Sequence, residues 1–245
     1  MPSTALITGA SRGLGLALAR ALAERGWRLV IDARGTAALE AARRELAALA
    51  DVTAIPGDVA DDRHRAALVE AAGGPIDALV NNASILGPSP QPALADFPLA
   101  TLEEVVRVNV MAPLALVQAA LPSQTSGARV VNVTSDAAVE AYEGWGGYGS
   151  SKAMLDQLSH VLAVEHPTLR IYAFDPGDMN TALHQATFPG EDISDRPPPE
   201  DSVPALLELI EGELASGRYR AADLVLRRLE AARRHQVAGL DAPRR

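Results

Sequence analysis

The sequence contains no cysteine, few aromatic residues and no excess of basic residues. Without cysteine there can be no disulfide, no thiolate nucleophile and no cysteine-ligated metal site. Acidic residues outnumber basic ones, which gives a formal net charge of −9, whereas nucleic-acid-binding domains usually carry a basic surface. We therefore expect no nucleic-acid partner.

Long uninterrupted apolar runs are also missing. No run approaches the ~18–20 residues that cross a membrane, and the first residues lack the basic and apolar regions of a signal peptide. We expect a cytoplasmic protein with no membrane partner. Hydrophobic residues make up 48% of the 245 residues, and neither a composition break nor an internal repeat divides the chain. Residues 1–245 are therefore predicted to form a single domain.

Short apolar runs alternate with amphipathic stretches, which is typical of strands alternating with helices. The alternation predicts an α/β fold: a Rossmann-like, doubly wound parallel sheet with helices on both faces. Such sheets bind ligands at the carboxyl ends of their strands. The expected strands are residues 4–8, 28–33, 52–55, 76–80, 129–134 and 169–174. The expected helices are residues 14–25, 36–49, 61–72, 99–121, 148–165 and 204–214, with a kink at Pro113.

A glycine-rich turn, residues 8–15, joins the first expected strand to the first expected helix. Its spacing is G-x-x-x-G-x-G. Glycines at such a turn let the backbone approach a pyrophosphate, and the helix N-terminus offers it unpaired N–H groups. The turn therefore indicates a dinucleotide site, although a plain strand-to-helix turn would need similar residues.

Tyr148 and Lys152 lie four residues apart, so a helix that starts near Tyr148 would place both side chains on one face. A fixed positive charge near a phenol favours the phenolate and lowers the pKa of the phenol. A pKa nearer the operating pH suits general acid–base catalysis. The pair alone could be an ordinary helical pair, but the other motifs favour the catalytic interpretation.

Taken together, these motifs resemble those of the short-chain dehydrogenases/reductases of the Tyr-x-x-x-Lys type. The resemblance covers roughly residues 4–181, and Ser135 precedes Tyr148 by thirteen residues, as in that family. It rests on TGASRGLG at 8–15, Asp58-Val59, NNAS at 81–84, Asn109, Ser135, YGSSK at 148–152, and Pro176-Gly177 with Thr181.

The resemblance implies an oxidoreductase that interconverts a small or medium carbonyl compound, a ketone or aldehyde, and an alcohol by hydride transfer, without a metal. Tyr148 would be the general acid in reduction and the base in oxidation, and Lys152 would lower its pKa and bind the nicotinamide ribose. Ser135 would hold the substrate oxygen, and Asn109 would position a water that relays protons to Lys152. The implied cofactor-binding residues are Gly9, Ser11, Arg12, Gly13, Leu14, Gly15, Arg34, Asp58, Val59, Asn81, Ala83, Tyr148, Lys152, Pro176, Gly177, Met179 and Thr181.

Cofactor choice depends on the end of the second expected strand, where an acidic residue binds the 2′-OH of NAD and an arginine accommodates the 2′-phosphate of NADP. In register with the family, Arg34 falls on the phosphate position and Ala33 on the position that is acidic in NAD-preferring members. Arg12, in the glycine turn, is a second basic residue of a type often seen in NADP-preferring members of the family. We predict that NADP(H) is preferred, with NAD(H) possible because Asp32 could turn towards the ribose.

Several positions keep two interpretations. Asn81 could pin the sheet as well as contact cofactor, and Asp58 could cap a helix instead of meeting the adenine. Ser84 stands where the family commonly has glycine. Asp136, with Glu140 and Glu143, could make the substrate mouth acidic or could simply be solvated.

Beyond Thr181 the resemblance weakens. We expect a substrate loop at about residues 178–200 and a basic amphipathic helix at about 221–237, while Tyr219 begins either a closing strand or only a turn. We expect a homodimer through the helices that bear Asn109 and Tyr148. Two alternative functions remain: a catalytically silent NADP(H)-sensing or regulatory protein, and a different reaction on the same fold, such as epimerisation or dehydration. The expected apolar wall of the substrate pocket is formed by Leu86, Tyr142, Trp145, Met179, Leu183 and Phe188.

Overall fold

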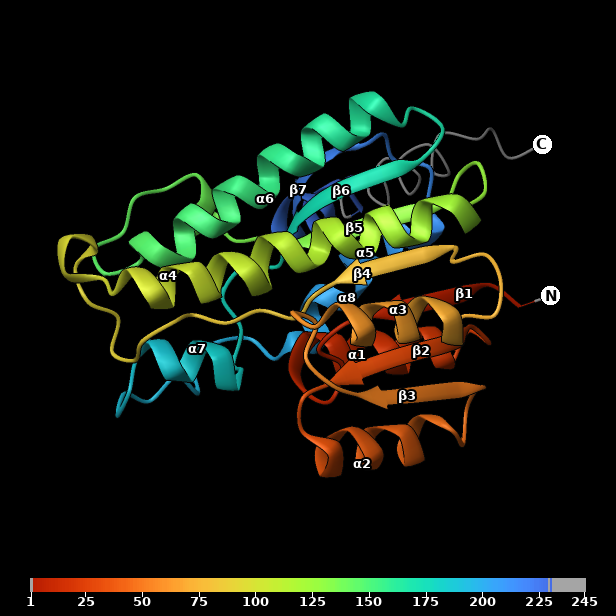
Figure 1. Cartoon of the computed structure of the whole chain (residues 1–245), viewed down its shortest axis with the longest axis horizontal. Coiled ribbons are helices and arrows are strands. Elements are labelled where there is room, and N and C mark those ends of the chain that lie inside the picture. Colours follow the sequence, from red (N-terminus) through yellow and green to blue (C-terminus); the bar gives the residue numbers. More distant parts are fainter. Residues whose placement is uncertain (1, 229, 231–245) are drawn as a thin grey trace, which may run out of the picture.

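A computed structural model describes residues 2–228 and 230. Its strands form one sheet in the order β3-β2-β1-β4-β5-β6-β7, and every neighbouring pair is parallel. Helices cover both faces of the sheet (Figure 1), so the predicted doubly wound α/β fold is confirmed. The strands are β1 (Thr4–Ile7), β2 (Arg28–Ala33), β3 (Val52–Pro56), β4 (Ala78–Asn81), β5 (Arg129–Val133), β6 (Arg170–Asp175) and β7 (Gly217–Arg220).

The helices connect successive strands, as a parallel sheet requires. The α-helices are α1 (Gly13–Ala23), α2 (Thr36–Leu46), α3 (Asp62–Ala71), α4 (Leu99–Val106), α5 (Ala112–Ala120), α6 (Gly146–Glu165), α7 (Ala182–Thr187) and α8 (Val203–Glu211). Shorter turns of helix are η1 (Leu94–Asp96), η2 (Arg107–Met111), η3 (Leu121–Ser123), η4 (Asp136–Ala138) and η5 (Pro199–Ser202).

The strands are apolar on both faces because both faces are covered. Along β1, Ala5 and Ile7 enter one core while Leu6 enters the other. Along β2, Val30 likewise lies in the second core. Side chains of α1, α2 and α8 fill the first core, and those of α3, α5 and α6 fill the second. This alternation follows from the two-residue period of a strand.

The strand order reverses between β1 and β4, which are neighbours in the sheet. From β1 the chain winds outward through β2 and β3, and from β4 it winds the other way. Loops at the carboxyl ends of β1 and β4 therefore diverge and leave a crevice between them. Most of the motifs singled out in the sequence follow the carboxyl ends of strands, and so lie around this crevice.

The predicted helix at 99–121 is present, but it is not uniform. A π-helical turn, η2, joins α4 to α5, and Pro113 falls at the start of α5 without ending the helix. The stretch Leu99–Ser123 is long and apolar enough to cross a membrane by length and composition, although no sequence run suggested a span. Half of its most apolar window is buried in the fold, as expected for a core helix.

In the C-terminal part, the structure decides one open alternative and differs from the expectation in one place. The closing strand, which the sequence left doubtful, is present: β7 pairs with β6 from Tyr172–Gly217 to Asp175–Arg220. The expected substrate loop contains α7. Residues 221–228 and 230 are helical, and the remainder of the predicted helix at 221–237 lies outside the described residues.

Candidate active site

One cleft runs along the carboxyl ends of the strands, from the turn after β1 to the loops after β5 and β6. Most of the predicted site residues line it. Gly15, Asn81 and Asn109 do not. The members that line the cleft are Gly9, Ser11, Arg12, Gly13, Leu14, Arg34, Asp58, Val59, Ala83, Ser135, Tyr148, Lys152, Pro176, Gly177, Met179 and Thr181.

The glycine turn has the backbone that a phosphate site needs. Gly9 and Gly13 have φ values of +68° and +57°, which only glycine adopts readily. The N-cap residue of α1, Arg12, makes no side-chain capping bond, so the first N–H groups of α1 remain free for an anion at the cleft. Gly15 has a packing role, since a Cβ there would lie 2.6 Å from the Gly9 carbonyl oxygen.

Asn82, which the sequence did not single out, holds this turn. Its Nδ2 donates to the carbonyl oxygens of Thr8 and Gly9, at 2.9 Å and 3.2 Å. The Thr8 hydroxyl oxygen in turn accepts from the amides of Asn82 and Ala83, both at 3.0 Å. The glycine turn is therefore tied to the end of β4. The second asparagine of NNAS was the available signal for this role.

Asp32 is buried, and both of its oxygens are engaged. Oδ1 accepts from the Gly9 amide at 2.7 Å, and Oδ2 lies 3.0 Å from Nε2 of His64. His64 also was not singled out, because nothing in the sequence places residue 64 beside residue 32. Asp32 therefore supports the glycine turn from behind.

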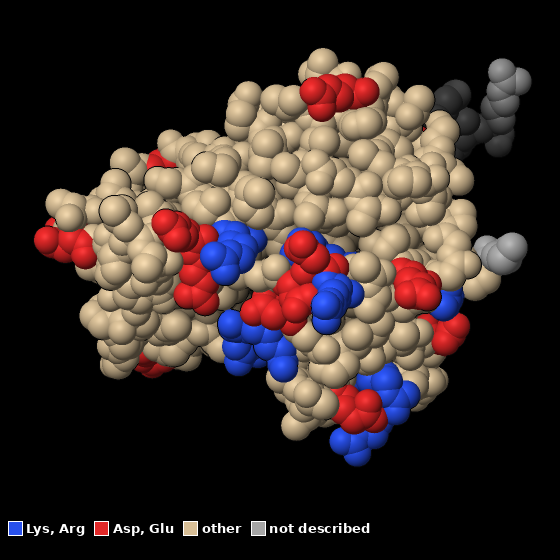
Figure 2. Space-filling view, in the orientation of Figure 1, with Lys and Arg blue, Asp and Glu red and all other residues tan. Residues whose placement is uncertain are grey.

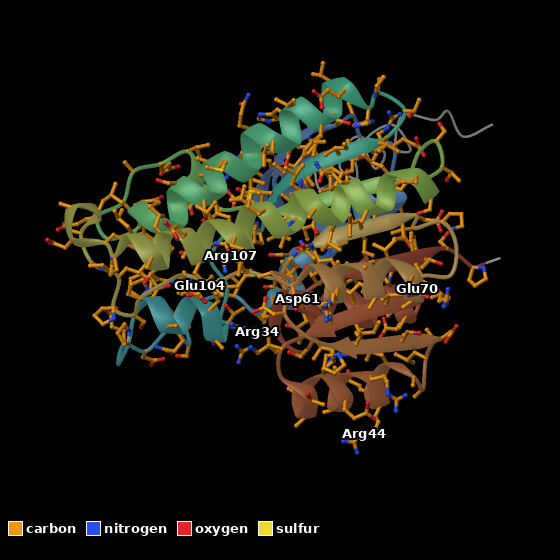
Figure 3. The ribbon with its side chains drawn as sticks, viewed as in Figure 1. Arg34, Arg44, Asp61, Glu70, Glu104 and Arg107 are labelled. Atoms are coloured by element: carbon orange, nitrogen blue, oxygen red, sulfur yellow. The ribbon has the colours of Figure 1, made fainter. Side chains whose placement is uncertain are left out.

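Arg34 and Arg12 line the cleft, and neither forms an ion pair within the described part of the chain. Figure 3 shows Arg34 projecting from the end of β2 towards the side of α7, whereas Arg44 points away from the molecule on α2. Arg34 follows β2 and Arg12 precedes α1, so the cleft carries two guanidinium groups without an ion pair to the described residues, which provide an anion site in addition to the helix N-terminus.

Two residues with open interpretations are placed by their contacts. Asp58 lines the cleft and accepts from the Ala60 amide at 2.8 Å, while Asp61 caps α3. Asn81 is buried, and its Nδ2 donates to Oδ1 of Asn132 on the neighbouring strand at 2.7 Å. The structural role considered for Asn81 is thus present, and the helix-capping role considered for Asp58 belongs to Asp61.

Tyr148 and Lys152 lie on one face of α6, which begins at Gly146, two residues before the expected start. Both side chains are buried, and both line the cleft. The Lys152 ammonium lies 5.4 Å from the centroid of the Tyr148 ring and donates to the Val133 carbonyl oxygen at 2.8 Å. The predicted pairing of phenol and ammonium is therefore present at the cleft.

Burial dominates the protonation of this pair. It raises the pKa of Tyr148 well above its ordinary value, and the charges of Asp175 and Asp136 raise it further. Ser84 opposes the rise, although its hydroxyl makes no well-aligned hydrogen bond. Burial lowers the pKa of Lys152 to about 8, while the charge of Asp156 raises it. The sequence-based expectation that Lys152 lowers the pKa of Tyr148 neglected this desolvation.

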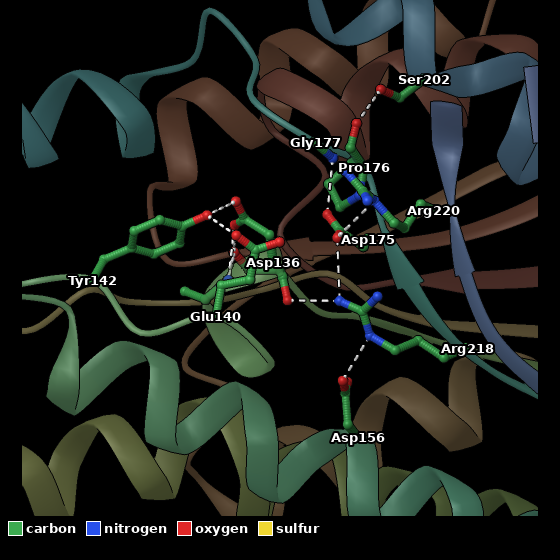
Figure 4. Close-up of polar contacts among 12 residues, drawn as sticks. Asp136, Glu140, Tyr142, Asp156, Asp175, Pro176, Gly177, Ser202, Arg218 and Arg220 are labelled. Carbon is green, nitrogen blue, oxygen red and sulfur yellow. Dashed lines mark hydrogen bonds and ion pairs between the residues drawn. The ribbon is translucent and has the colours of Figure 1, made fainter. Parts of the chain in front are cut away.

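Ser135 follows β5 and caps η4. Its hydroxyl donates to Oδ1 of Asp136 at 2.8 Å and accepts from the Ala137 amide at 3.2 Å. The Tyr142 hydroxyl lies 2.9 Å from carboxylate oxygens of both Asp136 and Glu140 (Figure 4). These carboxylates are therefore organised by hydrogen bonds, and Asp136 lines the cleft.

Asn109 is buried in the π-helical turn, where its side chain is fully used. Its amide exchanges two hydrogen bonds of 2.9 Å with the Ile85 backbone and donates to the Ser151 hydroxyl at 3.0 Å. Pro113 has no amide hydrogen, so the Asn109 carbonyl has no α-helical donor. If Asn109 positions a water, it would do so through this carbonyl.

Part of the cleft wall is apolar. Of the predicted wall, Leu86, Trp145, Met179 and Leu183 line the cleft, whereas Tyr142 and Phe188 do not. Phe188 packs behind the wall, with its ring centroid 6.3 Å from that of Trp145.

The glycine turn lies at a helix N-terminus, at the crevice of a doubly wound sheet, and a buried tyrosine and lysine line the same cleft. This combination defines a dinucleotide-dependent oxidoreductase. Residues 3–192 match the model of the protein family described as "short chain dehydrogenase". The chain therefore belongs to this family of oxidoreductases.

Relatives extend the likeness. The chain is 39% identical over 171 residues to a rhamnolipids biosynthesis 3-oxoacyl-[acyl-carrier-protein] reductase of Pseudomonas aeruginosa, a match that spans 66% of each chain. It is 32% identical over 220 residues to an (S)-benzoin-forming benzil reductase of Saccharomyces cerevisiae, covering 85% of this chain and 81% of the other. An alcohol dehydrogenase of Thermococcus sibiricus, solved with 5-hydroxy-NADP, is 26% identical, with a TM-score of 0.81 and 90% and 96% of the two chains covered.

Proposed function

We propose that this protein is an NADPH-dependent oxidoreductase that interconverts a ketone or aldehyde and an alcohol, with Tyr148 as the general acid and base. The observation that carries the proposal is the convergence of Ser135, Tyr148 and Lys152 on the cleft that also contains the glycine turn. The 245 residues would form a single cofactor-binding domain in the cytoplasm.

The residues divide the chemistry between them. Bound at the cleft, the nicotinamide would supply or accept the hydride. Ser135 would hold the substrate oxygen, and Tyr148 would deliver a proton to that oxygen as charge develops on it. Lys152 would hold the nicotinamide ribose and keep a positive charge beside the phenol. Trp145 and Leu86 would exclude water from the reacting atoms.

The raised pKa of Tyr148 favours reduction. A phenol that holds its proton at neutral pH is ready to act as an acid, whereas alcohol oxidation needs the phenolate. At neutral pH the protonated phenol suits carbonyl reduction, and alcohol oxidation is expected to need a higher pH.

NADPH is the proposed cofactor because the acidic side chain near the end of β2 is already hydrogen-bonded, whereas basic side chains at the cleft are available. Asp32, the residue that could have bound the 2′-OH of NAD, already holds Gly9 and His64. Arg34 and Arg12 line the cleft without an ion-pair partner among residues 2–228, and they suit a 2′-phosphate. The relative from Thermococcus sibiricus was solved with an NADP derivative, which supports the same choice. NAD(H) would bind more weakly.

The proposed substrate is a small or medium carbonyl compound with an apolar body. The wall formed by Leu86, Trp145, Met179 and Leu183 favours aliphatic or aromatic groups over a sugar phosphate. Two relatives are named as reductases of 3-oxoacyl and benzil substrates, both of which are carbonyl compounds.

An assay of NADPH and NADH oxidation across aldehydes, ketones and diketones tests the proposal. The expected result is turnover of at least one carbonyl, with a higher kcat/KM for NADPH than for NADH. If NADPH binds while no carbonyl is reduced and no alcohol is oxidised, the sensing or regulatory alternative replaces the enzyme.

A further inference from the structure

Arg218 lies on β7, in the part of the chain where the resemblance to the family weakens. Its guanidinium contacts three different elements (Figure 4). Nε donates to Oδ2 of Asp156 on α6 at 3.0 Å. Nη2 donates to the Ser135 carbonyl oxygen at 2.9 Å and to Oδ2 of Asp175 at 3.2 Å. Arg218 does not line the cleft, so these contacts reach the site from behind.

These contacts connect the two loops that flank the reacting centre. The Ser135 carbonyl belongs to the residue that would hold the substrate oxygen. Oδ1 of Asp175 accepts from the Gly177 amide at 3.0 Å, and Gly177 has a φ of +75° at the turn that lines the cleft. One guanidinium thus fixes the substrate side directly and the Pro176-Gly177 turn through Asp175.

The charges behind the cleft are also balanced through Arg218. Asp156 and Asp175 are buried carboxylates, and Lys152 is a buried ammonium one helical turn before Asp156. The Arg218 side chain is 19% exposed and pairs with both carboxylates. Arg220, on the same strand, is 53% exposed and reaches Asp175 only at 4.0 Å. Without Arg218, the two buried carboxylates would lose their ion-pair partner, and only Lys152 and the more distant Arg220 would remain to balance their charge.

We propose that Arg218 is a positioning residue, which holds the Ser135 loop and the Pro176-Gly177 turn in their working arrangement and balances the carboxylates behind Tyr148 and Lys152. Its effect on turnover rests on the proposed reductase function. Its effect on the two loops does not.

The charges that act on Tyr148 and Lys152 give this proposal a distinct signature. Asp136 on η4 and Asp175 on β6 act on Tyr148, and Asp156 on α6 acts on Lys152. Arg218 on β7 pairs with Asp156 and Asp175. Loss of the guanidinium leaves negative charge uncompensated, which stabilises the protonated forms. The pKa values of both Tyr148 and Lys152 should therefore rise.

The test compares Arg218→Met with Arg220→Met, a matched control on the same strand. We expect Arg218→Met to speed amide hydrogen exchange in residues 133–138 and 175–181, to weaken NADPH binding, and to lower kcat at least about tenfold with the pH profile moved to higher pH. Arg220→Met removes a charge 4.0 Å from Asp175 but breaks no contact with Asp156 or the Ser135 loop, so we expect clearly smaller effects on exchange, NADPH binding, kcat and the pH profile. A folded Arg218→Met protein with wild-type exchange and an unmoved pH profile would overturn the proposal, as would equal effects of the two variants.

Arg218→Lys is a second, milder variant, which keeps the proposal testable if Arg218→Met does not fold. A single ammonium cannot reach all three acceptors, so we expect partial recovery of kcat and partial protection of the two loops. Exchange in both loops identical to wild type in a folded Arg218→Lys protein would contradict the proposal. If the wild-type protein turns over neither carbonyls nor alcohols, the reductase proposal fails, while hydrogen exchange and NADPH affinity still decide the role of Arg218.

Discussion

At the scale of single residues, cofactor choice depends on which groups are already occupied. Asp32 has the right chemistry for a ribose 2′-OH, but its oxygens bind Gly9 and His64. Arg34, two residues later, faces the cleft without an ion-pair partner among the described residues. The sequence alone could not separate these two, because the contact with His64 joins residues 32 positions apart.

We predict that Arg34→Ala erases most of the preference for NADPH. Hydrogen bonds to a charged group contribute about 1.5–3 kcal/mol, so the NADPH dissociation constant should rise roughly 10- to 100-fold while that of NADH stays nearly unchanged. Titrating each cofactor against protein fluorescence measures both constants. Arg44→Ala, on the exposed side of α2, is the control and should change neither. Equal affinities for NADPH and NADH in the wild-type protein would contradict the cofactor proposal.

The lowered pKa of Lys152 predicts how activity depends on pH. Burial brings this pKa from its ordinary value of 10.5 down to about 8, so the ammonium loses its proton as pH rises through about 8. The charge beside Tyr148 then disappears. We expect kcat/KM for NADPH, which reports groups of the free enzyme, to fall above about pH 8. A profile that stays flat from about pH 7 to about pH 9 would argue against this account.

At the scale of elements, the turn between β1 and α1 is held by close backbone packing. The Gly15 position is crowded by the Gly9 carbonyl and by the Asn82 side chain, at 2.6 Å and 2.7 Å from a built Cβ. An alanine there would push the turn away from β4 and disturb the free N–H groups of α1.

We predict that Gly15→Ala destabilises the protein by about 1–3 kcal/mol, the usual cost of overpacking, and weakens both cofactors together. Thermal unfolding and cofactor titration provide the two readouts. Gly74→Ala is the control, because a Cβ at Gly74 meets nothing within 4 Å. A Gly15→Ala protein with wild-type stability and cofactor affinity would show that the turn tolerates a side chain.

The elements were predictable where periodicity was strong. β1 is a short apolar run and β5 is rich in valine, which favours strands, and α1 and α6 follow their patterns within a few residues. β7 was doubtful because an edge strand with the sequence GRYR has no apolar pattern. The short helix α7 was not predicted, because it lies in a segment that was expected to be a loop.

The position of the site was predictable where a sequence motif marks it. Ser135, Tyr148 and Lys152 meet at the cleft as expected. The contacts of Asn82, His64 and Arg218 are with residues far away in the chain, so no local sequence pattern predicts them. The protonation of Tyr148 could not be foreseen either, because it depends on burial.

At the scale of the whole molecule, the helices α5 and α6 present a face with few charges (Figure 2). Apolar side chains are exposed on α6 and at the end of η2, just before α5, with Val164 at 81%. Exposed apolar groups gathered on one face are typical of an interface between subunits. We propose that a second copy covers this face in a homodimer. The exposed residues are Met111, Met154, Val161 and Val164.

We predict that light scattering after gel filtration gives the mass of a dimer for the wild-type protein. Val161→Lys would bury a charge in the interface and should shift the protein towards the monomer. Leu49→Lys, at an exposed apolar position after α2, is the control and should leave the mass unchanged. A monomeric wild-type protein would contradict the proposed dimer.

The most direct test of the proposed reductase is turnover by Tyr148→Phe, measured on a carbonyl that the wild-type protein reduces. The variant keeps the buried ring and loses only the hydroxyl that would deliver the proton. General acid catalysis contributes roughly 100- to 10,000-fold, so we predict a fall in kcat of this size with NADPH affinity nearly unchanged. Turnover equal to the wild type, with NADPH bound normally, would contradict the central role of Tyr148.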